Sequence, residues 1–135
     1  MERNRYYLTA GAIGLFTSAV HLVAGQMDIV NPMMAAVFDG TAKHTMLACW
    51  HLVSADLLLT SAAFLAAGWR PQRYAVGGVL PAFAALHWVL WTVVFVTVAV
   101  LSDLPSPFMA LPQPVLFLPV IVSTALGMRR GAANG

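Results

Sequence analysis

Four histidines and one aspartate are the residues of this chain that are best placed to do chemistry. His21, His51 and His87 each lie inside a different long apolar stretch, His44 lies just before the second stretch, and Asp56 lies inside it. An ionisable side chain at membrane depth is rare and is usually functional, because the hydrocarbon core cannot solvate it. We therefore expect a polar site within an otherwise apolar protein.

The chemistry of imidazole and the positions of the histidines suggest metal coordination. Neutral imidazole is the commonest side-chain metal ligand, and we place His21 and His51 within about one helical turn of each other in depth. His44 shares a helix face with His51, two turns or roughly 10 Å away. We predict that His21, His44 and His51 contribute to a transition-metal site near the outer side of the membrane.

A flat cofactor is the second form of the same hypothesis. Imidazoles on facing helices of a bundle can hold heme iron, and tryptophan rings can wall a heme or a quinone. We predict a cofactor site for heme b or a transition-metal ion, with a quinone as a further candidate. Its predicted residues are His21, His51, His87, Trp50 and Trp91.

Asp56 and His87 form a separate predicted pair. The second apolar stretch enters the membrane from outside and the third returns from inside, so both residues are expected near the midplane. A lone carboxylate there is costly and tends to be protonated or paired. We predict that Asp56 and His87 interact and take part in a proton-linked function.

Two other interpretations stay open beside the preferred one, which is cofactor binding in an electron-transfer or oxidoreductase setting. In the first, the chain is a cofactor-free accessory or assembly subunit of a membrane complex, and its polar residues only join helices. In the second, it is a small oligomeric conductor of protons or metal ions. Whether the protein is an enzyme stays open, because no HExxH, GxSxG, CxxC, GxGxxG or P-loop motif is present.

The amino-acid composition indicates that transmembrane helices position these residues. Of 135 residues, 60% are hydrophobic and 9% are charged, whereas a soluble domain averages about a quarter charged. The sequence predicts a single-domain, all-α integral membrane protein whose four transmembrane helices form a bundle in the lipid bilayer. The spans are expected at about 7–24, 46–67, 74–101 and 113–128.

Basic residues predict the orientation. With four spans, six of the seven fall on one side and only Lys43 falls on the other; the six are Arg3, Arg5, Arg70, Arg73, Arg129 and Arg130. The positive-inside rule then places both termini in the cytoplasm and the chain in the inner (cytoplasmic) membrane. The basic residues form no patch, so we expect no nucleic-acid partner, whereas a membrane partner subunit or a homo-oligomer remains open.

The two outer loops differ in character. Asn31, Pro32 and Gly40 predict a short interfacial helix that Asn31 caps, that Pro32 begins and that Gly40 ends. The proline-rich segment at 102–114 predicts a stiff, irregular connection. Cys49 is the only cysteine, which excludes a disulfide within the chain, and its apolar surroundings predict a buried, inert thiol.

Overall fold

The structure is a computed structural model that describes residues 3–133, and helices account for most of them. No strand occurs in this range. In chain order the elements are α1 (Arg5–Val20), the π-helix η1 (His21–Val30), α2 (Asn31–Ala35), α3 (Gly40–Trp69), α4 (Pro71–Tyr74), the 3-10 turn η2 (Val76–Gly78), α5 (Val79–Leu101), α6 (Pro107–Ala110) and α7 (Pro114–Ala133).

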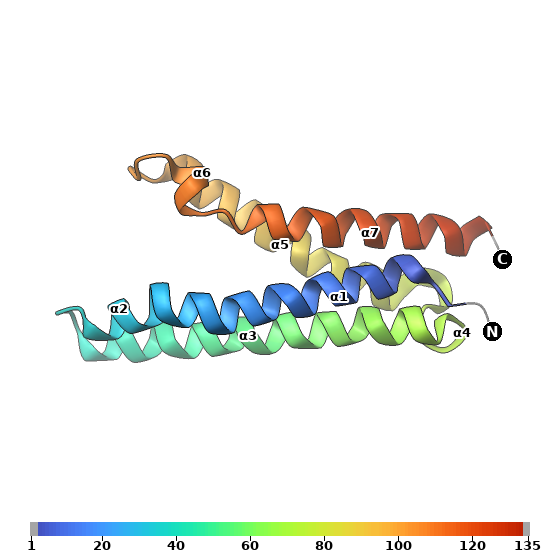
Figure 1. The fold of residues 1–135 in the computed structure, drawn as a ribbon, viewed down its shortest axis with the longest axis horizontal. Coiled ribbons are helices and arrows are strands. Elements are labelled where there is room, and N and C mark those ends of the chain that lie inside the picture. The colour runs from blue at the N-terminus through green and yellow to red at the C-terminus, as the bar shows by residue number, and fades with distance from the viewer. Residues whose placement is uncertain (1–2, 134–135) are drawn as a thin grey trace.

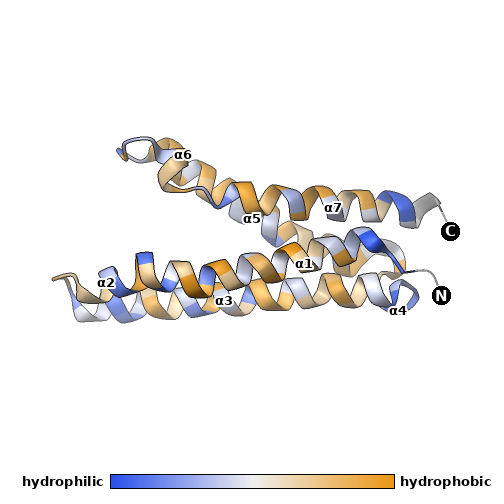
Figure 2. Ribbon diagram, in the orientation of Figure 1, coloured by the Kyte–Doolittle hydropathy of each residue, from blue (hydrophilic) through white to orange (hydrophobic). Residues whose placement is uncertain are grey.

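Within the described residues, three continuous helices are long and apolar enough to cross a membrane: Arg5–Ala35, Gly40–Trp69 and Val76–Leu101. The expected all-α membrane architecture is therefore confirmed at this level. The first two helices have 31 and 30 residues, or about 45 Å at 1.5 Å per residue. Both exceed a hydrocarbon core of about 30 Å. Apolar residues predominate along the helices, and strongly polar residues gather at several of their ends (Figure 2).

The long helices form two pairs. α1 lies beside α3, and α5 lies beside α7 (Figure 1). α7 also packs against α1, which joins the two pairs. The pairs lie close together at the end that carries the chain termini and α4, and they diverge toward the end that carries α2 and α6 (Figure 1). Residues near the divergent end therefore have fewer protein neighbours than residues near the closed end.

Small residues allow α1 and α3 to approach closely. Gly14, Thr17 and Ser18 are buried. A Cβ atom on Gly11 would lie 2.6 Å from Cγ of Leu65, and one on Gly68 would lie 2.7 Å from the backbone nitrogen of Leu8. Backbone approach of this kind is a main source of helix association in membranes, where lipid removes the hydrophobic drive.

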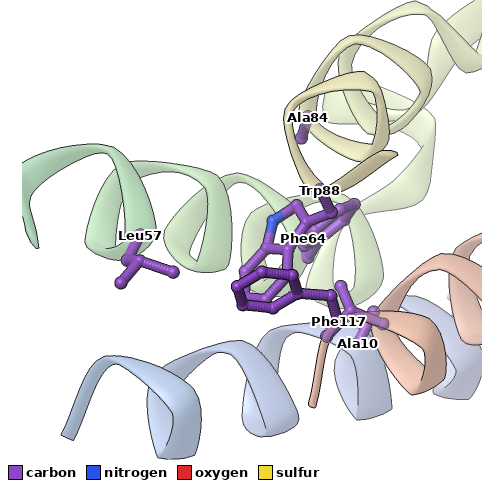
Figure 3. Close-up of a cluster of buried hydrophobic side chains, with 7 residues drawn as sticks. Ala10, Leu57, Phe64, Ala84, Trp88 and Phe117 are labelled. Carbon is purple, nitrogen blue, oxygen red and sulfur yellow. The ribbon is translucent and has the colours of Figure 1, made fainter. Parts of the chain in front are cut away.

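The core lies where all four long helices meet (Figure 3). Its largest member is Trp88, which is fully buried and packs edge-on against Phe117 at 5.6 Å between ring centroids. The Trp88 indole N–H donates to Oγ1 of Thr60 at 3.1 Å. Buried Trp N–H groups need such a partner, so this bond fixes the register of α5 against α3.

Asn4 joins three helices at the closed end. Its side-chain oxygen accepts from the backbone N–H of Tyr6 and Tyr7, which caps α1. Its side-chain amide donates to the carbonyl of Gly127 in α7 at 2.9 Å, and its backbone N–H donates to the carbonyl of Gly68 in α3 at 3.0 Å. The cap therefore also fixes where α3 and α7 end relative to α1.

The expected interfacial helix is wrong in its boundaries. α1, η1 and α2 are continuous, so Asn31 and Pro32 lie inside a helix that ends at Ala35. The preceding π-helix has a wider backbone: the N–H of Asn31 donates to the carbonyl of Gln26, five residues earlier. A widened turn of this kind accommodates Pro32. Gly40 begins α3 instead of ending a helix, because the Asp39 side chain caps α3 by accepting from Ala42 at 2.8 Å.

Candidate functional site

Asp56 and His87 meet between α3 and α5, close to the middle of both helices. Nε2 of His87 lies 3.9 Å from Oδ1 of Asp56. The side chains are 29% and 33% exposed, so the pair lies at the border between the protein and its surroundings. The expected contact is present in the structure, while its proton-linked role stays a prediction.

The hydrogen bond on the other side of the His87 ring determines what this pair can do. Nδ1 of His87 lies 3.0 Å from the carbonyl oxygen of Phe83. A carbonyl can only accept, so Nδ1 carries a proton. In the neutral ring, Nε2 therefore presents its lone pair toward Asp56. Two acceptors face each other unless one proton is added, either at Nε2 of His87 or on the Asp56 carboxylate.

His21 belongs to a second site, between η1 and α3. Its ring stacks on the ring of Trp50, with centroids 3.8 Å apart and planes 16° apart. Nε2 of His21 lies 3.1 Å from Oγ of Ser54. Ser54 in turn donates its hydroxyl proton to the carbonyl of Trp50 at 2.9 Å. The hydroxyl must accept from His21, so Nε2 of His21 carries the proton and Nδ1 holds the lone pair.

The helix changes geometry at His21. The π-helix η1 begins at this residue, and π-helical turns are rare and frequently occur at functional sites. Gly25 lies one turn further, and a Cβ atom there would collide with the ring of Trp50. The absence of a side chain at Gly25 therefore lets the Trp50 ring lie against η1 and receive the His21 ring.

His44 and His51 lie on the exposed surface of α3. Nδ1 of His44 bonds to the carbonyl of Gly40 at 2.8 Å, while the His51 side chain forms no hydrogen bond within residues 3–133. In that range, no three or more His, Cys, Asp or Glu side chains form a group that could hold a metal ion. The structure therefore does not bring His21, His44 and His51 together as a ligand set, and their coordination stays a prediction.

The cofactor hypothesis has a direct spectroscopic check. If His21 and His51 ligate heme or a transition metal, alanine at either position should remove most of the bound cofactor, because a lost ligand has no nearby substitute. His44→Ala should have a smaller effect. The measurement is the absorption spectrum and metal content of the protein purified from membranes. A full cofactor complement in both single variants would rule out coordination by this pair.

The tryptophans divide between the two sites and the core. The Trp50 ring stacks against the His21 ring. Trp91 is partly buried and packs against Trp88 and Phe117, with centroid distances of 5.4 and 6.0 Å. Both predicted cofactor-binding tryptophans thus contact protein side chains in this structure, and their role toward a cofactor remains a prediction.

Sequence reasoning missed Ser54, which belongs to the His21 site, and also Thr60 and Asn4, which join helices in the core and at the closed end. Hydroxyl residues inside apolar stretches are common and usually bond to the preceding turn of their own helix, so their type alone does not single them out. The available signal for Ser54 was its position one turn beyond Trp50. Cys49 was predicted to be buried, but its side chain is exposed, because this part of α3 lies toward the divergent end of the bundle.

Comparison with known proteins gives no further guide: no family model, no curated protein and no solved structure matches this chain.

Proposed function

We propose that this chain is a proton-conducting membrane protein in which the Asp56–His87 pair is the proton-binding group. The observation that supports the proposal most is the position of His87. Its Nδ1–H is held by the Phe83 carbonyl, and its Nε2 lies 3.9 Å from the Asp56 carboxylate. A proton placed between these two atoms has a ring nitrogen on one side and a carboxylate oxygen on the other, which is the arrangement that a proton relay needs.

The proposed mechanism uses these two side chains as a relay. A proton reaching Nε2 of His87 produces an imidazolium beside a carboxylate, which stabilises it. Release of the same proton from Nε2, or from Asp56 after transfer, restores the starting state without moving the Nδ1–H bond to Phe83. The partial exposure of both side chains supports access from outside the chain, as at an interface between copies in an oligomer.

The proposal includes four spans, with α7 as the fourth, in the inner membrane. α7 has 20 residues, which is about 30 Å of helix and matches a hydrocarbon core. The arrangement of the helices supports an even number of crossings, because the first and last described residues lie at the same end as α4 (Figure 1). Arg3, Arg70 and Arg129 are at this end, which the positive-inside rule assigns to the cytoplasm.

This topology predicts the result of reporter fusions. A reporter at Gly135 and one at Arg70, between α3 and α4, should both report the cytoplasm, while one placed between Pro105 and Pro112 should report the opposite side. The physical reason is the six-to-one distribution of basic residues. If Gly135 and the Pro105–Pro112 segment report the same side, α7 does not cross the membrane.

Proton flux in liposomes tests the function itself. The wild-type protein is reconstituted into liposomes that contain a pH-sensitive dye, and a potassium diffusion potential drives proton entry. Asp56→Asn should abolish most of the flux, because an amide cannot exchange the proton, while it preserves the size of the side chain. His87→Gln should do the same. Asp103→Asn is the matched control, because it removes one carboxylate outside the helices and should leave the flux unchanged.

The same assay separates the competing hypotheses. No flux above protein-free liposomes for the wild type contradicts the proposal and favours a cofactor-free accessory subunit. Flux that persists in both Asp56→Asn and His87→Gln contradicts the role of this pair. A coloured protein whose flux depends on reduction would instead favour the electron-transfer hypothesis.

A double-mutant cycle tests the contact independently of flux. Asp56→Leu and His87→Leu should each destabilise the protein in detergent, and the double variant should cost less than the sum by about 0.5–3 kcal/mol. The reason is that either single change leaves the other side chain without its partner. Additive losses would show that the two side chains do not meet.

A further inference from the structure

A basic pocket lies at the closed end of the molecule, far along α3 from the histidine sites. Its volume is about 630 Å³, and it is lined by Arg3, Trp69, Arg70, Gln72 and Arg73. Three arginines therefore line one space, together with an aromatic residue and a glutamine. None of these residues takes part in the proposed proton relay.

The positive charge of this pocket is not neutralised by any carboxylate among residues 3–133. The acidic residues in that range are Asp28, Asp39, Asp56 and Asp103. Asp28 lies within η1, Asp39 lies just before α3 and Asp103 lies just after α5, all toward the opposite end, and Asp56 faces His87 in the middle. Three neighbouring guanidinium groups repel one another, so an anion bound between them would remove an unfavourable interaction.

The structure orders the backbone that carries these residues and holds the Arg3 side chain against Trp69. The backbone N–H of Asn4 donates to the carbonyl of Gly68 at 3.0 Å, which fixes Arg3 beside the end of α3. The Arg3 guanidinium lies 3.6 Å from the ring centroid of Trp69. On the other side, the Arg70 carbonyl accepts from the N–H groups of Arg73 and Tyr74, both at 3.0 Å, which closes the turn that carries Arg70 and Arg73.

We propose that this pocket binds the phosphate of an anionic membrane lipid. Guanidinium groups bind phosphate oxygens with paired, charge-assisted hydrogen bonds, and basic pockets at the ends of membrane helices are suited to lipid headgroups. Free phosphate shares this chemistry. The lipid is favoured by the position of the pocket, because Trp69, Val76 and Val79 expose 52%, 69% and 72% of their surface beside it along the chain. Acyl chains can cover these apolar side chains, which inorganic phosphate cannot.

Lipid binding to the full-length protein in neutral detergent tests the proposal. The probes are short-chain phosphatidylglycerol, short-chain phosphatidylcholine and inorganic phosphate, and the measurement is saturation of the bound fraction by native mass spectrometry. We expect phosphatidylglycerol to bind saturably, and we expect neither phosphatidylcholine nor inorganic phosphate to do so. Arg70→Gln with Arg73→Gln should weaken it by about tenfold or more, because two charge-assisted contacts are lost.

The control removes the same charge from outside the pocket. Arg5→Gln with Arg129→Gln should leave the affinity for phosphatidylglycerol within about twofold, and circular dichroism should show that both double variants keep the helical fold. Equal weakening in the two double variants would mean a non-specific effect of net charge and would overturn the proposal. Saturable binding of inorganic phosphate with no preference for the lipid would overturn the assignment to a membrane headgroup.

Discussion

Replacing Trp88 with alanine should lower the free energy of unfolding in detergent by about 4 kcal/mol. The side chain is fully buried where all four long helices meet, and it contacts the rings of Trp91 and Phe117. Its loss also leaves Oγ1 of Thr60 without the indole donor at 3.1 Å. In a membrane protein the cost comes mainly from lost packing and the cavity left behind, since lipid weakens the hydrophobic drive between helices.

The measurement is a reversible unfolding curve in a mixture of mild and denaturing detergents. Leu90→Ala is the matched control, because Leu90 lies on the same helix and is 52% exposed. This control should change stability by no more than about 0.5 kcal/mol. Similar losses for the two variants would mean that α5 is not anchored through Trp88.

Gly68→Val should cost about 3 kcal/mol and separate the ends of α1 and α3. A Cβ atom at this position would lie 2.7 Å from the backbone nitrogen of Leu8. Backbone cannot rotate away as a side chain can, so one helix must move. That movement also weakens the hydrogen bond from the Asn4 N–H to the Gly68 carbonyl, and with it the link between the cap of α1 and the end of α3.

Gly131→Val is the control for this substitution. Gly131 is also a helical glycine, in α7, and a Cβ atom there would meet no other atom within 4 Å. Both variants change helix propensity by a similar small amount, so their difference isolates the packing term. Thermal unfolding monitored by circular dichroism in detergent measures it. Equal stability of the two variants would contradict the close approach of α1 and α3.

Much of the fold was predictable because lipid imposes simple rules on sequence. Long apolar stretches with few charges must form helices, since every backbone N–H and C=O in hydrocarbon needs a partner within the segment. The helix ends were less predictable. Pro32 suggested the start of a new helix, but the π-helix η1 continues directly into α2, which contains this residue.

The candidate sites were predictable in part. The pairing of Asp56 with His87 followed from depth, which the direction of each span determines. The partners of His21 did not follow, because Trp50 and Ser54 are chosen by the rotation of α3 about its axis, and that rotation depends on packing along the whole helix. His51 and Cys49 are exposed, although the sequence suggests buried roles for both, because this part of α3 lies toward the divergent end of the bundle.

The sequence by itself determined that this chain forms apolar helices long enough to cross a membrane, with ionisable residues inside its apolar stretches, because the cost of burying charge and backbone in lipid acts on each segment separately. The tertiary structure alone decided which of those residues meet. His87 reaches Asp56, His21 reaches Trp50 and Ser54, and Arg3 joins Arg70 and Arg73 around one pocket. These contacts depend on how α1, α3 and α5 rotate and cross, which is the outcome of many small packing interactions between segments.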